Sequence, residues 1–199
     1  MVLTDPALLA GRETVDVCRR AAAGGATMIQ VRWKGGTPAA IAALARALVG
    51  ALAIPVLVND RVDIALAAGA AGAHLGWDDL PLAAARRITP AGFILGISVG
   101  SPDEAARARN LPADYWSVGP CFATTTKLEA GAPLGSDGFG RLASMAPRGV
   151  PVIGIGGLTA ATAGAIRRAG GAGVAVAAAV FGATDPRAAA SAVSASVSP

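Results

Sequence analysis

Short apolar runs alternate along this chain with Ala-rich segments in which polar residues recur at helical spacing. The apolar runs predict strands over Val2–Leu3, Thr27–Arg32, Pro55–Asn59, Gly72–Leu75, Phe93–Ser98, Tyr115–Gly119, Val150–Ile155 and Gly173–Ala177. The segments between them predict helices over Thr14–Ala23, Pro38–Ala51, Arg61–Ala68, Leu82–Ile88, Pro102–Asn110, Gly138–Met145, Ala160–Ala169 and Asp185–Val193. Strands that alternate with helices indicate a parallel sheet with right-handed crossovers. Eight such units fit a closed (β/α)₈ barrel.

The chain is expected to form a single α/β domain over residues 1–199, because nothing in its composition marks a linker or a second domain. Its length is at the low edge for a TIM barrel, so the loops must be short. An open, doubly wound sheet is the alternative. The Gly-rich turn that a dinucleotide-binding sheet carries after its first strand is missing here. We expect the last six residues, 194–199, to fray.

The amino-acid composition limits where the protein can be located and which kind of molecule it can bind. The chain is 53% apolar, but its most apolar stretch, Gly171–Ala183, is too short to span a membrane. The first residues carry neither a basic region nor a cleavage site, so we expect a cytoplasmic protein. The net charge is +4, yet the Lys and Arg residues are scattered and aromatic residues are only 4%. This pattern disfavours nucleic acid and fits small anionic substrates such as phosphorylated metabolites. The two cysteines do not form a disulfide framework.

Candidate chemistry follows the predicted strands, because a barrel of this kind has its active site at the C-terminal ends of the strands. After the second strand, alternation would place Gln30, Arg32 and Lys34 on one side. Two cations and an amide at the barrel mouth suit a phosphate or a diphosphate. The alternative is a strand that simply ends in solvent with two charged residues.

Two carboxylates follow the third and fourth strands. Asn59 and Asp60 end the third strand, and Asp79 follows the fourth. On adjacent strands, Asp60 and Asp79 would be neighbours at the mouth, and carboxylates beside a phosphate site are typical of Mg²⁺. The alternative is that these residues cap the following helix or turn. His74 lies inside a strand, and we expect a packed, hydrogen-bonded core histidine rather than a metal ligand.

The later strands add a loop and a possible anion site. The segment from Cys121 through Thr124, Thr126 and Lys127 to Ser136 is long and rich in hydroxyl groups, which favours a loop that covers substrate. Cys121 is not expected to be a nucleophile, because the lone histidine is too far away to serve as its base. Gly156–Gly157 after the seventh strand and Ala177–Ala178 after the eighth occupy the usual phosphate position of these barrels.

These segments resemble thiamine phosphate synthases. Gln30-Val31-Arg32-Trp33-Lys34 matches Q-x-R-x-K, residues 59–63 match N-D-R-x-D, residues 74–81 match H-L-G-x-x-D-L-P, residues 119–127 match G-P-x-F-x-T-x-T-K, and Gly154-Ile155-Gly156-Gly157 matches the family's G-G loop. The five motifs occur in order over nearly the whole chain, and the set is far more specific than any one of them.

The resemblance implies a reaction and a set of roles. The family joins hydroxymethylpyrimidine diphosphate to a thiazole phosphate and releases diphosphate. By motif, Gln30, Arg32, Lys34, Asn59, Ser98 and Lys127 would hold the pyrimidine diphosphate, Asp60 and Asp79 would bind Mg²⁺, and Thr124, Thr126, Gly157, Ala177 and Ala178 would hold the thiazole phosphate. Loss of diphosphate leaves a stabilised pyrimidine cation, and the cations Arg32, Lys34 and Lys127 would be catalytic by stabilising the leaving group. The thiazole nitrogen attacks, so no protein nucleophile is needed.

The chain departs from the family pattern at three positions. Ala178 stands where the family usually has Ser, Trp33 where it has an acidic residue, and Gly100 where it has His. The related thiazole tautomerases remain an alternative, although they usually lack the aspartate pair and the Thr-x-Thr-Lys loop and rely on that His. A non-catalytic barrel that binds a phosphorylated ligand is a third possibility, because fold alone does not establish function.

Overall fold

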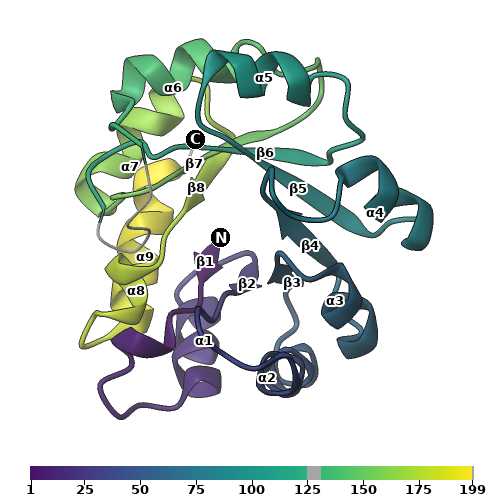
Figure 1. Cartoon of the computed structure of the whole chain (residues 1–199). Helices are drawn as coiled ribbons and strands as arrows, with labels where there is room; N and C mark the ends of the chain where they lie inside the picture. The colour runs from purple at the N-terminus through teal and green to yellow at the C-terminus, as the bar shows by residue number, and fades with distance from the viewer. Residues whose placement is uncertain (125–130, 199) are drawn as a thin grey trace.

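Eight parallel strands form the centre of the molecule, and each pairs with the next one along the chain (Figure 1). The structure is a computed structural model, and it describes residues 1–124 and 131–198. The strands are β1 (Val2–Leu3), β2 (Ile29–Val31), β3 (Val56–Asn59), β4 (Gly72–Leu75), β5 (Ile94–Val99), β6 (Tyr115–Val118), β7 (Val152–Ile155) and β8 (Gly173–Ala175). A bridge between Val2 and Val176 joins the first strand to the segment after the last, which closes the predicted barrel.

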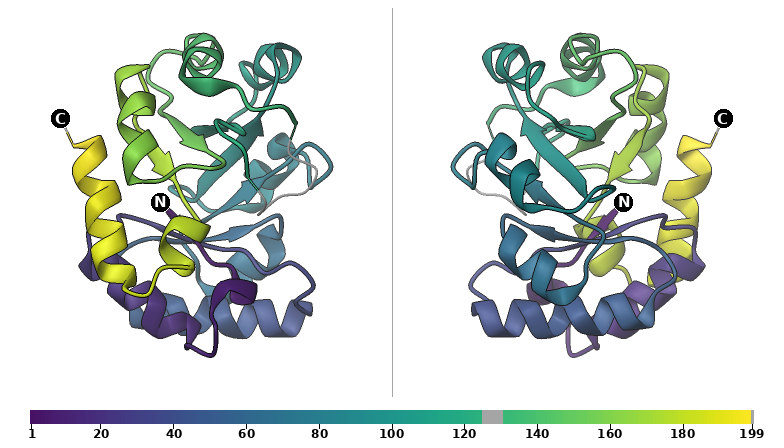
Figure 2. Two further views of the ribbon diagram at one scale, coloured as in Figure 1. Left: turned by 90° about the vertical axis from the view of Figure 1, so that its left-hand side faces the viewer. Right: turned by 90° about the vertical axis from the view of Figure 1, so that its right-hand side faces the viewer.

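Helices cover the outside of the strands (Figure 2). They are α1 (Thr14–Ala23), α2 (Pro38–Ala51), α3 (Val62–Ala68), α4 (Leu82–Ile88), α5 (Pro102–Ala108), α6 (Gly135–Ala143), α7 (Ala160–Arg168), α8 (Ala178–Phe181) and α9 (Pro186–Val197), with a 3₁₀ turn η1 (Pro6–Leu8) after β1. Local capping explains where several of these helices begin. Thr37, Ser101 and Asp185 each accept a backbone N–H with their side chains, and a proline follows each of them.

One expectation about the C-terminal part was wrong, and two short elements of the chain were not predicted. The predicted final helix does not fray after Val193, because α9 continues to Val197, where the Ser196 hydroxyl donates to the Val193 carbonyl and Val197 packs against the core. Neither α8 nor η1 was expected. The four residues of α8 are all apolar, so the sequence gives no sign that a helical turn follows β8.

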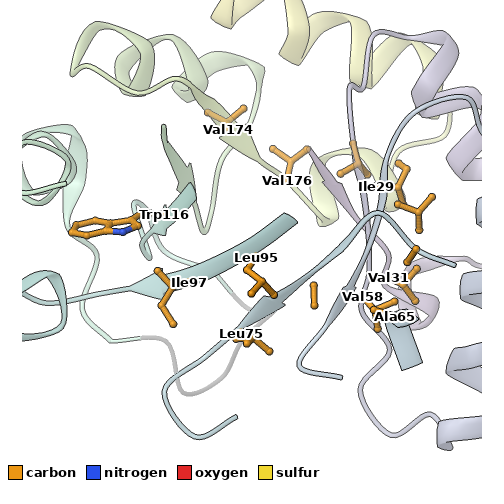
Figure 3. Packing of buried hydrophobic residues seen from close by; sticks show 14 of the residues in the cluster. Ile29, Val31, Val58, Ala65, Leu75, Leu95, Ile97, Trp116, Val174 and Val176 are labelled. Carbon is orange, nitrogen blue, oxygen red and sulfur yellow. The ribbon is translucent and has the colours of Figure 1, made fainter. Parts of the chain in front are cut away.

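The core lies between the strands and the helices. Outward-facing residues alternate with inward-facing ones along the strands. Figure 3 shows part of the buried hydrophobic cluster, including Leu75, Leu95 and Trp116. Alanines such as Ala85 and Ala105 are fully buried on the facing helices and let those helices approach the sheet closely. No helix in the described ranges is long and apolar enough to cross a membrane. The inward-facing strand positions carry more polar residues than the outward-facing ones, and these polar residues contribute to the candidate active site.

Candidate active site

A cavity of about 1140 Å³ opens at the C-terminal ends of the strands. Most of the predicted site residues line it, and they are Gln30, Arg32, Lys34, Asn59, Asp60, Asp79, Ser98, Thr124, Gly157, Ala177 and Ala178. Thr126 and Lys127 lie outside the described residues. The structure therefore brings together, around one cavity, every predicted position that it describes.

The cations after β2 reach the cavity for a reason other than the one expected. The strand ends at Val31, so Arg32 and Lys34 do not lie on the extended alternation. The backbone of Arg32 is instead fixed by Thr4, which is fully buried. The Thr4 hydroxyl donates to the Arg32 carbonyl at 2.8 Å and accepts the Arg32 backbone N–H at 2.9 Å. Lys34 is exposed at the cavity rim, and Arg32 is half-buried.

Asp60 lies at the rim in a left-handed backbone conformation, with φ at +65°. Only a small share of non-glycine residues take this conformation, and Asp is among the types that tolerate it. Its backbone N–H donates to the His74 carbonyl at 2.8 Å, which ties the turn after β3 to β4. The N-cap of α3 is Arg61, without a side-chain capping bond, so neither Asn59 nor Asp60 caps the helix as the alternative interpretation required.

Asp79 also lines the cavity, and one of its oxygens supports the turn after β4. Its Oδ2 accepts the Gly76 backbone N–H at 2.6 Å. The turn capping of the alternative interpretation is therefore present at Asp79, and within the described ranges no hydrogen bond involves the other carboxylate oxygen, Oδ1. No group of three or more His, Cys, Asp or Glu side chains with metal-binding geometry occurs among the residues that the structure describes. Protein ligands for a cation here would be the two carboxylates Asp60 and Asp79.

His74 is buried and hydrogen-bonded, as predicted, but it also faces the cavity. Its Nδ1 lies 2.9 Å from the hydroxyl of Tyr115, and its Nε2 lies 3.0 Å from Oγ of Ser98. Burial raises the pKa of Tyr115 well above its ordinary value, against a smaller opposite effect of a hydrogen bond with the Gln30 side chain. The phenol therefore stays neutral, with its proton in place.

The glycines after β7 serve close packing of two loops. Gly156 and Gly157 have φ of +91° and +63°. A Cβ at Gly157 would stand 2.3 Å from the carbonyl oxygen of Ala123, and a Cβ at Gly156 would stand 2.8 Å from Cα of Pro120. The loop after β6 is thus pressed against the loop after β7. A side chain at Gly157 would displace this loop first, whatever it did to a bound anion.

Ala177 and Ala178 stand at the start of α8, where the chain turns after β8. Within the described parts of the chain, the backbone N–H groups of Gly157, Ala177 and Ala178 donate to no other residue. These donors border the cavity and can hold an anion without a hydroxyl at Ala178. At the other end of α8, the Arg12 guanidinium donates to the carbonyls of Phe181 and Ala183.

Sequence reasoning missed several residues at the site. Tyr115 and Ser117, on inward positions of β6, are buried, and Ser117 lines the cavity. Glu104 of α5 also lines it and accepts the Gly100 backbone N–H at 2.5 Å. The alternation of Tyr115, Ser117 and Gly119 with outward apolar residues was the available signal. Thr4 lies next to the short β1, and nothing in the sequence indicates its bond to Arg32.

The two cysteines are buried, and neither lines the cavity. Burial raises the pKa of Cys18 to about 12 and that of Cys121 to about 11. A thiol with such a pKa stays protonated at neutral pH, and the thiolate is the nucleophilic form. The expectation that Cys121 is not a nucleophile therefore agrees with its surroundings.

The fold and the polar cavity define a (β/α)₈-barrel enzyme with its site at the C-terminal rim of the strands. Comparison with known proteins then gives the family: the chain belongs to the thiamine monophosphate synthases, whose family model matches residues 1–180. Thiamine-phosphate synthase of Azorhizobium caulinodans is 44% identical over 187 residues, which cover 92% of this chain and 87% of that protein. The enzyme of Roseiflexus castenholzii is 44% identical over 191 residues, covering 94% and 83%. The solved thiamine phosphate pyrophosphorylase from Pyrococcus furiosus has a TM-score of 0.87 and 32% identity, covering 98% of this chain and 94% of that one.

Proposed function

We propose that this chain is a Mg²⁺-dependent thiamine phosphate synthase, a transferase that joins hydroxymethylpyrimidine diphosphate to hydroxyethylthiazole phosphate. One observation carries the proposal beyond family membership. The cations Arg32 and Lys34 line the same cavity as the carboxylates Asp60 and Asp79. Cations and a carboxylate pair together suit a diphosphate with its divalent metal, which neither a simple phosphate binder nor an isomerase requires.

The pyrimidine diphosphate is assigned to the side of the cavity formed by β2 to β5. The pyrimidine ring would meet the side-chain amides of Gln30 and Asn59 and the hydroxyl of Ser98. The diphosphate would meet the positive charges of Arg32 and Lys34. Lys127, from outside the described residues, is proposed to join them over the leaving group. Cations in a partly enclosed site stabilise developing negative charge more strongly than they would in open water.

The carboxylates Asp60 and Asp79 fit Mg²⁺ by their chemistry. Both offer oxygen atoms, the ligand that Mg²⁺ prefers, and two protein carboxylates with substrate phosphates and waters are a usual set for this ion. The left-handed backbone at Asp60 places a carboxylate at the rim without using it as a helix cap. When bound, Mg²⁺ would neutralise charge on the departing diphosphate.

The thiazole phosphate is assigned to the opposite side, formed by the loops after β6, β7 and β8. The backbone N–H groups of Gly157, Ala177 and Ala178 have no partner among the described residues, and Thr124 and Thr126 would add hydroxyl donors. Backbone donors suit a phosphate because they need no side chain at Ala178. The two substrates would thus lie on facing sides of one cavity.

The chain's own residues perform binding and charge stabilisation. As the carbon–oxygen bond to diphosphate breaks, its electron pair goes to the leaving group, where Arg32, Lys34 and Lys127 stabilise it. The thiazole nitrogen supplies the electron pair for the new carbon–nitrogen bond. No residue needs to form a covalent intermediate, which agrees with the buried, protonated state of Cys121.

The direct test is to incubate the protein with both substrates, with Mg²⁺ or with EDTA, and to measure thiamine phosphate and diphosphate. We expect both products in equal amounts with Mg²⁺ and none with EDTA. Arg32→Gln is expected to lower turnover sharply. Isomerisation of a thiazole without diphosphate release would support a tautomerase instead, and binding of both compounds without turnover would support a non-catalytic binder.

A further inference from the structure

A line of hydrogen bonds crosses three strands beneath the cavity. Ser98 of β5 bonds to Nε2 of His74 on β4, and Nδ1 of the same ring bonds to the hydroxyl of Tyr115 on β6. The His74 and Tyr115 rings are also stacked, with centroids 5.5 Å apart. Tyr115 is 6% exposed and His74 is 5% exposed, so both rings are held away from bulk water.

A glycine on the strand between them makes this contact possible. Gly96 of β5 pairs with His74 on one side and with Tyr115 on the other. A Cβ at Gly96 would stand 2.2 Å from Cζ of Tyr115 and 2.5 Å from Nδ1 of His74. The missing side chain therefore leaves the space in which the two rings meet across β5.

The donors and acceptors along this line have a definite order. If the Tyr115 hydroxyl donates to Nδ1 of His74, then Nε2 carries the ring hydrogen and donates to Ser98. If Nδ1 carried the hydrogen instead, the phenol would accept it and would have to pass its own hydrogen to the Gln30 side chain. The hydrogen bond with Gln30, however, lowers the pKa of Tyr115, which is the effect of a group that donates to the phenol oxygen. The phenol hydrogen is therefore left for Nδ1 of His74, so the first order is favoured.

We propose that Tyr115 is a positioning residue that holds His74 as the Nε2–H tautomer, so that Ser98 accepts from the imidazole and turns its own hydrogen toward the cavity. Ser98 then offers a donor to whatever lies above it. On the proposed function, this donor selects an acceptor atom of the pyrimidine substrate, such as a ring nitrogen, and disfavours a group that can only donate.

The tautomer can be measured directly, because His74 is the one histidine in the sequence. In protein labelled with ¹⁵N-histidine, long-range ¹H–¹⁵N spectra distinguish a protonated ring nitrogen from an unprotonated one. We expect Nε2 to be protonated in the unaltered protein. In Tyr115→Phe, which keeps the ring and removes the hydroxyl, we expect a substantial population with Nδ1 protonated.

Trp116→Phe is the matched control for this spectrum. Trp116 is adjacent on β6, fully buried and on the outward side, so the variant disturbs packing without touching the hydrogen-bond line. We expect an unchanged tautomer. Protonated Nδ1 in the unaltered protein would overturn the proposal, and this result needs no variant to fold. A tautomer that is the same in Tyr115→Phe as in the unaltered protein would also overturn it.

A kinetic cycle tests whether Tyr115 acts through Ser98. Tyr115→Phe is expected to lower kcat/KM for the pyrimidine diphosphate by about fivefold, the scale of one hydrogen bond, with the KM for the thiazole phosphate unchanged. In a Ser98→Ala background the same change should have almost no further effect. Equal effects in both backgrounds would indicate a merely structural role. The spectrum does not depend on turnover, so an inactive protein would count against the proposed function and leave the tautomer result intact.

Discussion

The Thr4 hydroxyl makes two hydrogen bonds with the backbone of Arg32: it donates to the Arg32 carbonyl and accepts from the Arg32 N–H. Its own N–H donates to the Gln30 carbonyl at 2.9 Å, so the end of β1 runs beside the end of β2 for one residue beyond the ladder. A residue that touches no substrate in the proposed arrangement thus fixes the backbone of Arg32, a proposed catalytic cation.

Replacing Thr4 with Val keeps its shape and removes the hydroxyl. We expect the protein to lose about 1–3 kcal/mol of unfolding free energy, because backbone groups of Arg32 then lack a partner in a buried place. The KM for the pyrimidine diphosphate should rise, and that for the thiazole phosphate should not. Urea unfolding and separate substrate titrations measure the two effects. Thr4→Ser, which keeps the hydroxyl, should restore both, and a similar loss in Thr4→Ser would contradict this account.

Asp60→Asn tests the proposed metal site with little disturbance of the backbone. Asn tolerates a positive φ about as well as Asp, so the turn should survive while the charge is lost. We expect turnover to fall by on the order of a hundredfold, since a metal contributes several kcal/mol of charge stabilisation, and titration to show weaker Mg²⁺ binding. Asp63→Asn is the control, because Asp63 pairs with Arg61 at the surface. Wild-type Mg²⁺ affinity in both Asp60→Asn and Asp79→Asn would exclude this site.

Ala178→Ser tests the thiazole phosphate side. Gly157 is a poor position for this purpose, because any side chain there collides with the Ala123 carbonyl. A hydroxyl at position 178 adds one donor beside the proposed anion, so we expect the KM for the thiazole phosphate to fall by up to about fivefold. Ala172→Ser, exposed just before β8 at the opposite end of that strand, should change nothing. A rise in the same KM for Ala178→Ser would place the phosphate elsewhere.

Arg12→Ala should remove the hydrogen bonds that hold the C-terminal end of α8 in place. The guanidinium bonds to the Leu9 and Leu8 carbonyls as well as to those of Phe181 and Ala183. We expect a loss of about 2 kcal/mol in unfolding free energy and a higher KM for the thiazole phosphate, with the pyrimidine side little affected. Arg19→Ala removes the same charge from an exposed position of α1 and serves as control. Equal increases in both KM values would indicate general loosening of the barrel.

The cysteines should resist alkylation in the folded protein. Burial raises the pKa of Cys18 to about 12 and of Cys121 to about 11, so iodoacetamide at pH 8 should modify neither until urea is added. Because folding raises both values, the contribution of these thiols to stability is complete below their ordinary pKa and decreases as pH rises toward 11. Rapid inactivation that coincides with labelling of Cys121 would show that the thiol is accessible and ionised.

Much of the fold could be predicted from the sequence because each strand is a compact apolar run between turn residues. Val56–Asn59 and Gly72–Leu75 illustrate this, since their ends were placed within one residue. The rim residues followed from topology: parallel strands end at one edge, so Asp60 and Asp79 were expected at one rim, and both line the cavity. Local pattern alone was enough for these features.

The remaining features depend on contacts between distant segments. Tyr115 was missed because its role depends on the space left by Gly96 on another strand. Gly157 was assigned to the anion, whereas its conformation and close approach to Ala123 are first of all a packing requirement between two loops. Such relations are set by three-dimensional register, and no spacing along the chain encodes them.

The closure between β1 and β8 has a consequence for the order in which the site forms. Leu3 donates to the Val176 carbonyl at 2.8 Å, so two segments separated by almost the entire length of the chain must meet before this bond can form. Contacts between remote segments are slow to form compared with those between neighbouring strands. Gln30, Asn59, His74 and Ser98 lie on successive strands and can assemble early. Ala177 and Ala178 follow the closing bridge directly, so the side of the cavity proposed for the thiazole phosphate is expected to be the last part of the site to take shape during folding.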